Sequence, residues 1–260
     1  MNLKDNMNGE GKNLKGFRKL AETVMQSLFP PWKISQESSL RLIGLERVPI
    51  LIVQGFMMKR ESMYILDSEL KKAGFAPISF DLRRLGIGMS IEELSKNLRR
   101  KIEHFFTKKL SNGYHINKRI PAIGFSMGGI ILHYLTRVMD GAGFIDKVIG
   151  IASPVQGLNY AILTYPLKNI FPCTFDLWEG SSFIKNLRSA PYPPSCFFLS
   201  ISSKKDFMAP PHSCNLPELP NTKNIVFKEL FHSHLPFSPQ ISREVIDFLT
   251  SYGDFEQKYF

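Results

Sequence analysis

Residues 124–129 read Gly-Phe-Ser-Met-Gly-Gly and lie between a short apolar run and a stretch with helical periodicity. The run over 120–123 is apolar apart from one proline and predicts a strand. Apolar residues recur at helical spacing over 130–138, which predicts a helix that ends near Asp140 and Gly141. Glycines carry no Cβ, so the chain can turn tightly here and strand and helix can approach closely. We therefore expect Ser126 to project from a sharp strand-to-helix turn, as a candidate nucleophile.

A serine hydroxyl is a poor nucleophile at neutral pH, so Ser126 needs partners. They are a base within hydrogen-bond reach, a carboxylate that orients the base, and N–H donors for a developing oxyanion. In an open parallel sheet the crevice lies beyond the carboxyl ends of the strands. Only loops that leave those ends can therefore supply the partners.

Apolar runs and helical patterns alternate along most of the chain from Val48 onward. The alternation predicts parallel βαβ units, and hence an α/β fold with a mostly parallel, doubly wound sheet. The pattern breaks between Ser153 and Pro194, where prolines and aromatic residues are frequent, which predicts a helical or irregular lid insertion over about residues 155–194. Strands are predicted at 48–53, 76–80, 120–123, 147–152, 196–202 and 224–227, with helices at 61–72, 130–138 and 240–251 and after a capping box formed by Ser90 and Glu93.

The chain is predicted to have two parts, an N-terminal extension over 1–34 and one α/β domain over 35–260. Apolar residues recur at helical spacing over 14–28, and basic residues at 12, 15, 18 and 19 make this predicted helix basic and amphipathic. Such a helix could lie on an anionic membrane surface. Packing on its own domain is the favoured alternative.

The formal net charge of +10 raises the question of an acidic partner. The basic residues fall in short clusters such as 99–101 and 108–109, which are typical of solvated helix faces. No zinc-finger spacing, RNA-binding aromatic motif or glycine-rich phosphate loop accompanies them, so no nucleic-acid partner is expected.

The three cysteines show neither metal-ligand spacing nor a disulfide framework, which favours a reducing compartment. No signal peptide is evident, and no run approaches the roughly 18 apolar residues that cross a bilayer. A cytoplasmic protein, with peripheral membrane contact as an option, is therefore expected.

Candidates for the acid and the base follow the late strands. Asp206 directly follows the strand that ends near Ser202, and His232 and His234 follow the last predicted strand by a few residues. Either histidine could reach Ser126. Serine, acid and histidine then occur in the chain order of one hydrolase class. Three other histidines are less suitable, because His104 and His115 precede the nucleophile strand and His133 lies within the helix.

Several blocks resemble the α/β-hydrolase superfamily, and within it the bacterial lipase and esterase branch, across about residues 46–251. Residues 50–56 resemble the strand that ends in His-Gly and opens the oxyanion hole, although Gln54 replaces the usual histidine. Residues 80–82 resemble the next strand and its Asp-Leu turn. Residues 151–157 and 180–187 are similar to the Thr-Pro-His-Gly segment and to the glycine-serine stretch of the lid.

The resemblance also implies roles for single residues. The residues that usually follow the family's histidine match Leu235, Phe237 and Ser238 only if His232 is the base, so His232 is preferred and His234 is the alternative base. The backbone N–H groups of Phe56 and Met127 are then the oxyanion donors. Gln54 can also donate and accept hydrogen bonds, so we expect a perturbed rather than a missing oxyanion hole.

These implications define a serine carboxylic-ester hydrolase, a lipase or esterase, with Ser126, Asp206 and His232 as the triad and no metal or organic cofactor. Aromatic residues of the predicted lid suggest an acyl ester or a lipid as substrate. A thioesterase or an acyltransferase would use the same acyl-enzyme. A hydrolase-like scaffold that has lost activity and acts as a binding protein is the alternative outside enzymes.

Overall fold

The computed structural model describes residues 47–79, 88–110 and 119–251. The chain divides into two compact units, Met1–Leu40 and Arg41–Phe260, and all described residues belong to the second unit. The predicted N-terminal helix, the Asp-Leu turn at residues 80–82 and His115 lie outside the described residues. The boundary near residue 34 therefore stays a prediction.

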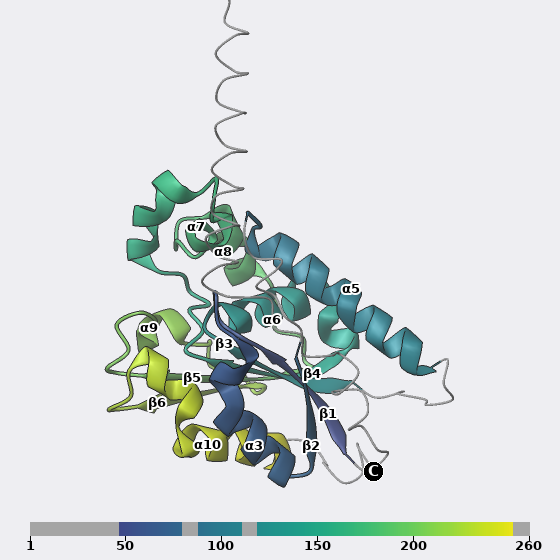
Figure 1. Cartoon of the computed structure of the whole chain (residues 1–260). Helices are drawn as coiled ribbons and strands as arrows, with labels where there is room; N and C mark the ends of the chain where they lie inside the picture. Colours follow the sequence, from purple (N-terminus) through teal and green to yellow (C-terminus); the bar gives the residue numbers. More distant parts are fainter. Residues whose placement is uncertain (1–46, 80–87, 111–118, 252–260) are drawn as a thin grey trace, which may run out of the picture. The chain divides into compact units, whose positions relative to one another are not determined.

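The described residues form one six-stranded sheet in the order β2-β1-β3-β4-β5-β6 (Figure 1). All neighbouring strands pair in parallel, which confirms the predicted sheet. The strands are β1 (Val48–Val53), β2 (Phe75–Ser79), β3 (Ile120–Phe125), β4 (Ile145–Ile151), β5 (Phe197–Ser203) and β6 (Thr222–Phe227).

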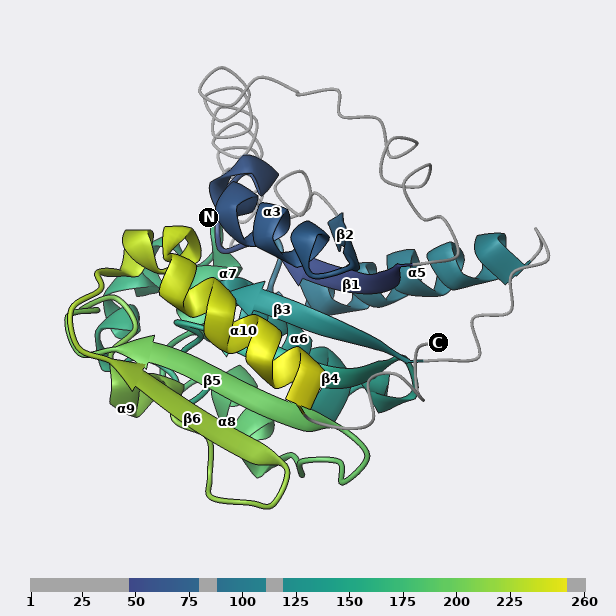
Figure 2. The ribbon, with the colours of Figure 1, turned by 90° about the horizontal axis from the view of Figure 1, so that it is seen from below.

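Helices cover both faces of the sheet, as a doubly wound fold requires (Figure 2). Helices α3 (Tyr64–Lys72) and α10 (Pro239–Ser251) pack on one face. Helices α5 (Ile91–Leu110), α6 (Met127–Arg137) and α8 (Ser182–Ser189) pack on the other. The shorter elements are α7 (Pro172–Asp176) and α9 (Pro211–Cys214), and the 3-10 helices η1 (Arg60–Met63), η2 (Gly141–Gly143), η3 (Asn159–Leu167) and η4 (His232–Phe237).

Strands β1 to β5 are largely apolar on both sides because both of their faces are buried. In β1, Leu51 and Val53 join the cluster under α5 and α6, whereas Ile50 and Ile52 join the cluster under α3 and α10. Each fully buried aliphatic side chain of this kind contributes about 1.5–3 kcal/mol of transfer free energy. Continuous apolar runs are the sequence signature of such strands.

The predicted capping box begins α5. Ser90 N donates to Glu93 Oε2 at 2.8 Å, and Glu93 N donates to Ser90 Oγ at 3.2 Å. The two bonds satisfy N–H groups that have no acceptor within the helix.

The chain reverses its direction across the sheet between β1 and β3. From β1 it first moves outward to β2, and from β3 onward each new strand adds on the opposite side. At such a switch point the connections leave in opposite directions and open a crevice beyond the carboxyl ends of the strands. The loops after β1 and β3 leave the sheet at this switch point.

Candidate active site

Ser126 occupies a sharp turn between β3 and α6. Its φ of 52° and ψ of −123° lie in a region that residues with a side chain rarely adopt, at a cost of about 1–3 kcal/mol. The turn is held from both sides, because Ser126 N donates to Ile151 O at 2.8 Å and Gly129 N donates to Ser126 O at 3.1 Å. The local geometry is the strand-to-helix turn expected from the sequence.

Close backbone packing explains the glycines around Ser126. A Cβ on Gly124 would lie 2.3 Å from Gly129 Cα, and one on Gly128 would lie 2.2 Å from Val53 O. A Cβ on Gly129 would lie 2.0 Å from Ser153 Oγ. Each distance is far below van der Waals contact. The start of α6 can therefore approach β3, β1 and the end of β4 only with glycine at these positions.

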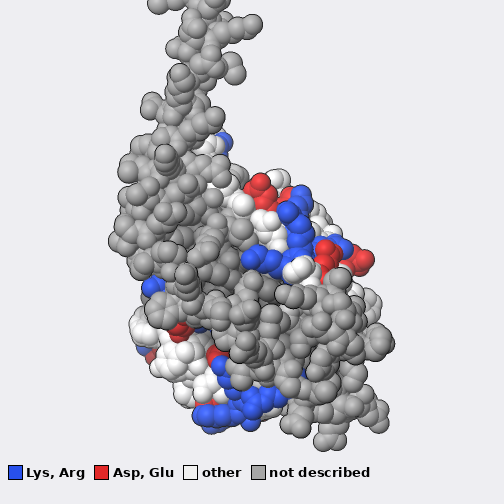
Figure 3. Space-filling model, turned by 45° about the vertical axis from the view of Figure 1, so that its right-hand side comes forward, with Lys and Arg blue, Asp and Glu red and all other residues white. Residues whose placement is uncertain are grey.

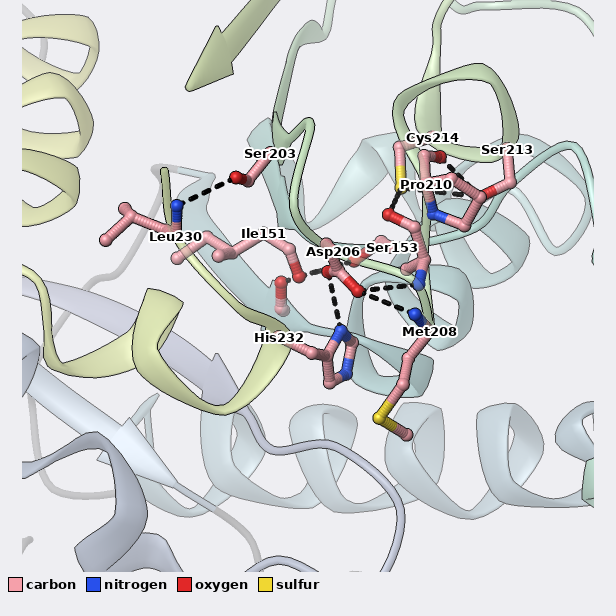
Figure 4. Close-up of polar contacts among 12 residues, drawn as sticks. Ile151, Ser153, Ser203, Asp206, Met208, Pro210, Ser213, Cys214, Leu230 and His232 are labelled. Carbon is pink, nitrogen blue, oxygen red and sulfur yellow. Dashed lines mark hydrogen bonds and ion pairs between the residues drawn. The ribbon is translucent and has the colours of Figure 1, made fainter. Parts of the chain in front are cut away.

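Asp206 is the buried carboxylate of the site. It follows β5, and its side chain has 0% exposed surface. Its Oδ1 accepts hydrogen bonds from Met208 N at 2.9 Å and from Ala209 N at 2.8 Å. Its Oδ2 lies 2.7 Å from His232 Nδ1 (Figure 4). The two backbone donors fix one oxygen, so the other is directed at the imidazole.

His232 is held between the carboxylate and the end of β3. Its ring centroid lies 4.9 Å from that of Phe125, the residue before Ser126. In the neutral ring, a proton on Nδ1 donated to Asp206 leaves Nε2 as an acceptor. The structure thus brings Asp206 and His232 together beside the residue that precedes the candidate nucleophile.

His234, the alternative base, is in a different setting. Its side chain is exposed, and its ring packs edge-to-face on Phe231 at 5.7 Å between centroids. Asp206 is paired with His232 instead. His104 is exposed on α5, whereas His133 is buried in α6, where its ring stacks on Phe198 at 5.4 Å. Burial, then the charge of Arg137, lowers the pKa of His133 well below its ordinary value.

The loop after β1 passes directly beside the serine. A Cβ on Gly55 would lie 3.3 Å from Ser126 Cβ and 3.1 Å from Phe125 Cδ1. The loop turns at Met57, whose φ is 58°, and Met58 N donates to Gly55 O at 3.2 Å. The backbone of Phe56 therefore lies within a tight turn next to the candidate nucleophile.

Gln54 ties this loop to the neighbouring strand. The side chain is buried, and its Nε2 donates a hydrogen bond to the hydroxyl of Ser79 at the end of β2. The amide can hold the loop through this hydrogen bond. Its effect on catalysis stays a prediction.

Met127 begins α6, and the N–H groups of a first helical turn have no acceptor within the helix. The helix dipole also favours negative charge at this end. The candidate donor at Met127 therefore lies where a charge developing beside Ser126 would be stabilised. The Phe56 ring packs edge-to-face on Phe171, with the ring centroids 6.0 Å apart.

Two contacts of the site have no signal in the sequence. Ser203 Oγ accepts from Leu230 N at 3.1 Å, which ties the segment before His232 to the end of β5 (Figure 4). The hydroxyl of Tyr160 in η3 donates to the carbonyl oxygen of Met208. Both join segments far apart in the chain, and neither belongs to a recognisable motif.

A buried cysteine, Cys214, also lies close to the site. Burial raises the pKa of the Cys214 thiol, which lies near the acid loop, to about 12, so this thiol stays protonated. Within the described ranges, no group of three or more histidine, cysteine, aspartate or glutamate side chains could hold a metal ion. None of the described helices is both long and apolar enough to cross a membrane.

Basic side chains of the described surface form separate groups, with acidic side chains among them on the face in Figure 3. Several are paired along helices, as in Lys96 with Glu92 at 2.6 Å and Arg99 with Glu103 at 2.8 Å. Paired helix faces of this kind are consistent with the solvated surface predicted from the clusters.

No protein-family model and no curated protein matches the chain. Solved structures match most of it. A Bacillus licheniformis lipase in its mature form is similar with a TM-score of 0.59 and 14% identity, over 78% of this chain and 89% of that one. For a monoacylglycerol lipase from Paleococcus ferrophilus the TM-score is 0.60 and the identity 15%, over 79% and 95% of the two chains. A thermophilic esterase from Thermogutta terrifontis has a TM-score of 0.54 and 15% identity, over 79% of this chain and 90% of that one.

Low identity limits this likeness to architecture. The chain has the α/β-hydrolase fold, as the resemblance of its sequence blocks implied. One fold supports several chemistries, so the reaction has to be inferred from the site.

Proposed function

We propose that the protein is a serine hydrolase that cleaves carboxylic esters, with Ser126 as nucleophile, His232 as base and Asp206 as the orienting acid. The observation that carries the proposal is the contact of 2.7 Å between Asp206 and His232, beside the strained turn at Ser126. The strain is maintained by packing, as is common at functional sites.

The proposed reaction has two steps. His232 Nε2 takes the proton of the Ser126 hydroxyl, and the serine oxygen attacks the ester carbonyl. The N–H groups of Phe56 and Met127 stabilise the oxyanion, and His232 then returns the proton to the leaving alcohol. Water activated by His232 releases the acid from the acyl-enzyme and restores Ser126.

The test uses three variants on a short p-nitrophenyl ester. We expect Ser126→Ala to lose turnover and covalent labelling by a fluorophosphonate, because labelling needs an activated serine. His232→Asn should lose both as well. His234→Asn is the matched control, because it makes the same change two residues away, and it should keep both. Labelling of Ser126→Ala, or equal losses in the two histidine variants, would contradict the proposal.

The substrate that we propose is an acyl or lipid ester. Large apolar side chains are exposed on η3 and on the loop that carries Asp206, and we call this set the apolar rim. The two parts adjoin, because the Tyr160 hydroxyl donates to Met208 O. The rim comprises Ile162 (39% exposed), Leu163 (79%), Leu167 (49%), Phe207 (79%) and Met208 (62%).

Exposed apolar surface of this kind fits an acyl chain or a lipid surface better than a small polar substrate. Exposed Lys204 lies three residues before Phe207, which favours an anionic surface, whereas Lys205 is paired with Glu229. Two of the similar solved structures are described as lipases.

Rates on butyrate and long-chain esters, with and without anionic vesicles, test the substrate class. Phe207→Ser should lower the long-chain rate with vesicles severalfold and leave the butyrate rate unchanged. A preference for butyrate that vesicles do not alter would reject a lipid substrate while leaving the ester hydrolase intact.

A further inference from the structure

The loop that carries Asp206 combines a buried carboxylate with exposed neighbours. Asp206 is 1% exposed, but the next two residues, Phe207 and Met208, are among the most exposed apolar residues of the described chain. Side-chain packing therefore cannot fix this part of the loop. Its conformation depends on the hydrogen bonds that its backbone makes.

One of those bonds comes from outside the loop. Tyr160 lies in η3, which belongs to the insertion between β4 and β5, and its hydroxyl donates to Met208 O. The same peptide group donates on its other side, because Ala209 N lies 2.8 Å from Asp206 Oδ1.

The two bonds act on one rigid unit. A peptide group is planar and trans, so its C=O and N–H point in opposite directions and turn together. A hydroxyl that holds the oxygen of Met208 therefore fixes the direction in which the N–H of Ala209 points. That N–H is one of the two backbone donors that orient the carboxylate toward His232.

Tyr160 is suited to donate this bond. Burial raises the pKa of its phenol above the ordinary value, and the negative charge of Asp206 adds to the effect. The hydroxyl thus keeps its proton throughout the range in which a histidine base works.

We propose that Tyr160 is a positioning residue for the acid, whose hydroxyl holds the Met208–Ala209 peptide so that Asp206 stays directed at His232. The insertion is thereby coupled to the reactivity of the site. This inference rests on the proposed function, since it assigns Tyr160 a role in the same reaction.

The test is Tyr160→Phe in the full chain, with Tyr165→Phe as matched control. Tyr165 lies in the same 3-10 helix, and its hydroxyl interacts with Lys168 rather than with the acid loop. Both variants are assayed on a short soluble ester, and rates are expressed per site labelled by a fluorophosphonate. This normalisation removes any unfolded fraction from the comparison.

For Tyr160→Phe we expect kcat to fall about fivefold, the rate equivalent of one neutral hydrogen bond, with KM unchanged. The acid limb of the kcat/KM profile should move to lower pH, because a less firmly held carboxylate stabilises the imidazolium less. Tyr165→Phe should match the wild type in all three quantities.

Each other outcome is decisive. A wild-type chain that the fluorophosphonate does not label would overturn the proposed function and this inference with it. Normal labelling with unchanged kcat and pH profile in Tyr160→Phe would overturn this inference alone. A rise in KM without a change in kcat or pH profile would also overturn it, because Tyr160 would then act on substrate binding.

Discussion

Gly129→Ala tests the packing that holds the serine turn. The added Cβ would lie 2.0 Å from Ser153 Oγ and 2.6 Å from Ser153 Cβ, but 3.3 Å from Gly124 O, which is tight yet tolerable. Ser153 is buried and its hydroxyl donates to Ile151 O at 3.2 Å. Rotation of the hydroxyl would break this bond and leave the 2.6 Å overlap in place, so the start of α6 has to shift. Overpacking of this kind costs about 1–3 kcal/mol, and the closeness of the overlap places Gly129→Ala near the upper limit.

A second substitution at the other side of the contact isolates the cause. Ser153→Gly alone should cost about 1–2 kcal/mol, from the lost hydrogen bond and the added backbone freedom. In the double variant the overlap with Ser153 is gone, so the two costs should fall short of additivity by at least about 1.5 kcal/mol. Urea unfolding of the four chains measures this coupling.

Gly143→Ala is the control for the glycine change itself. A Cβ at Gly143 meets no atom within 4 Å, so the stability should stay within about 0.5 kcal/mol of the wild type. Additive costs in the double variant, or a Gly129→Ala variant as stable as Gly143→Ala, would refute the packing argument. A folded Gly129→Ala chain should also lose ester turnover, because Gly129 N donates to Ser126 O.

Three further predictions concern single buried groups. Asp206→Asn keeps an oxygen for the two backbone donors but presents an NH₂ group to His232 Nδ1. The imidazole proton then moves to Nε2, so this nitrogen can no longer accept the serine proton. We expect kcat to fall about 10³–10⁴-fold with little change in the melting temperature. Burial, with a smaller contribution from the acidic first turn of α5, raises the pKa of Asp176 from 3.8 to about 6. Between these two pH values the folded chain keeps a proton that the unfolded chain releases. The free energy of unfolding therefore falls as pH rises from about 4 to about 6. Asp176→Asn retains an acceptor for Ile91 N but has no carboxylate to ionise. In urea unfolding it should therefore be more stable than the wild type by about 2 kcal/mol at pH 7 and by less than about 0.5 kcal/mol at pH 4. A stability difference independent of pH would contradict this cause. Arg137 donates to three carbonyl groups at and just after the end of α8, and its guanidinium lies 3.7 Å from the centre of the Tyr192 ring. Arg137→Lys should therefore lower the free energy of unfolding by about 2 kcal/mol. An unchanged free energy of unfolding would show that the planar group is not needed.

Periodicity was sufficient to predict the sheet. The predicted strands overlap all six observed strands, and β1 to β5 are largely apolar runs between two covered faces, whereas the edge strand β6 is mostly exposed or half-buried. The ends differ by a few residues. For example, β3 extends to Phe125 although the prediction ended at residue 123, since a glycine at 124 gives no local sign of whether the strand or the turn begins there.

The chain order of the strands limited the candidate acid and base to the loops after β5 and β6. Periodicity could not separate His232 from His234, and only the resemblance favoured the first. The observed pairing has a geometric cause. Both histidines lie in η4, and side chains two residues apart in a 3-10 helix point about 240° apart, so only one of them can face Asp206.

The insertion could be recognised from the sequence, but its tertiary contacts could not be predicted from it. Its important contacts join residues far apart, such as Ile91 N to Asp176 Oδ2 across 85 positions and Tyr160 to Met208 across 48. Such contacts depend on how η3 and α7 pack on the domain. Short 3-10 and helical turns lack the long apolar periodicity from which packing can be predicted.

The connectivity of the sheet separates the groups proposed to react from the insertion proposed to select the substrate. Ser126, Asp206 and His232 follow β3, β5 and β6, whereas the insertion lies between β4 and β5. Substitutions in the part of the apolar rim that lies in the insertion, Ile162, Leu163 and Leu167, can therefore change the ester that is bound without moving the groups proposed to react. Tyr160 is the exception, since its hydroxyl reaches from the insertion to the backbone around Asp206. A change in the insertion that displaces Tyr160 should consequently alter kcat, and one confined to Leu163 should alter only the preference among esters.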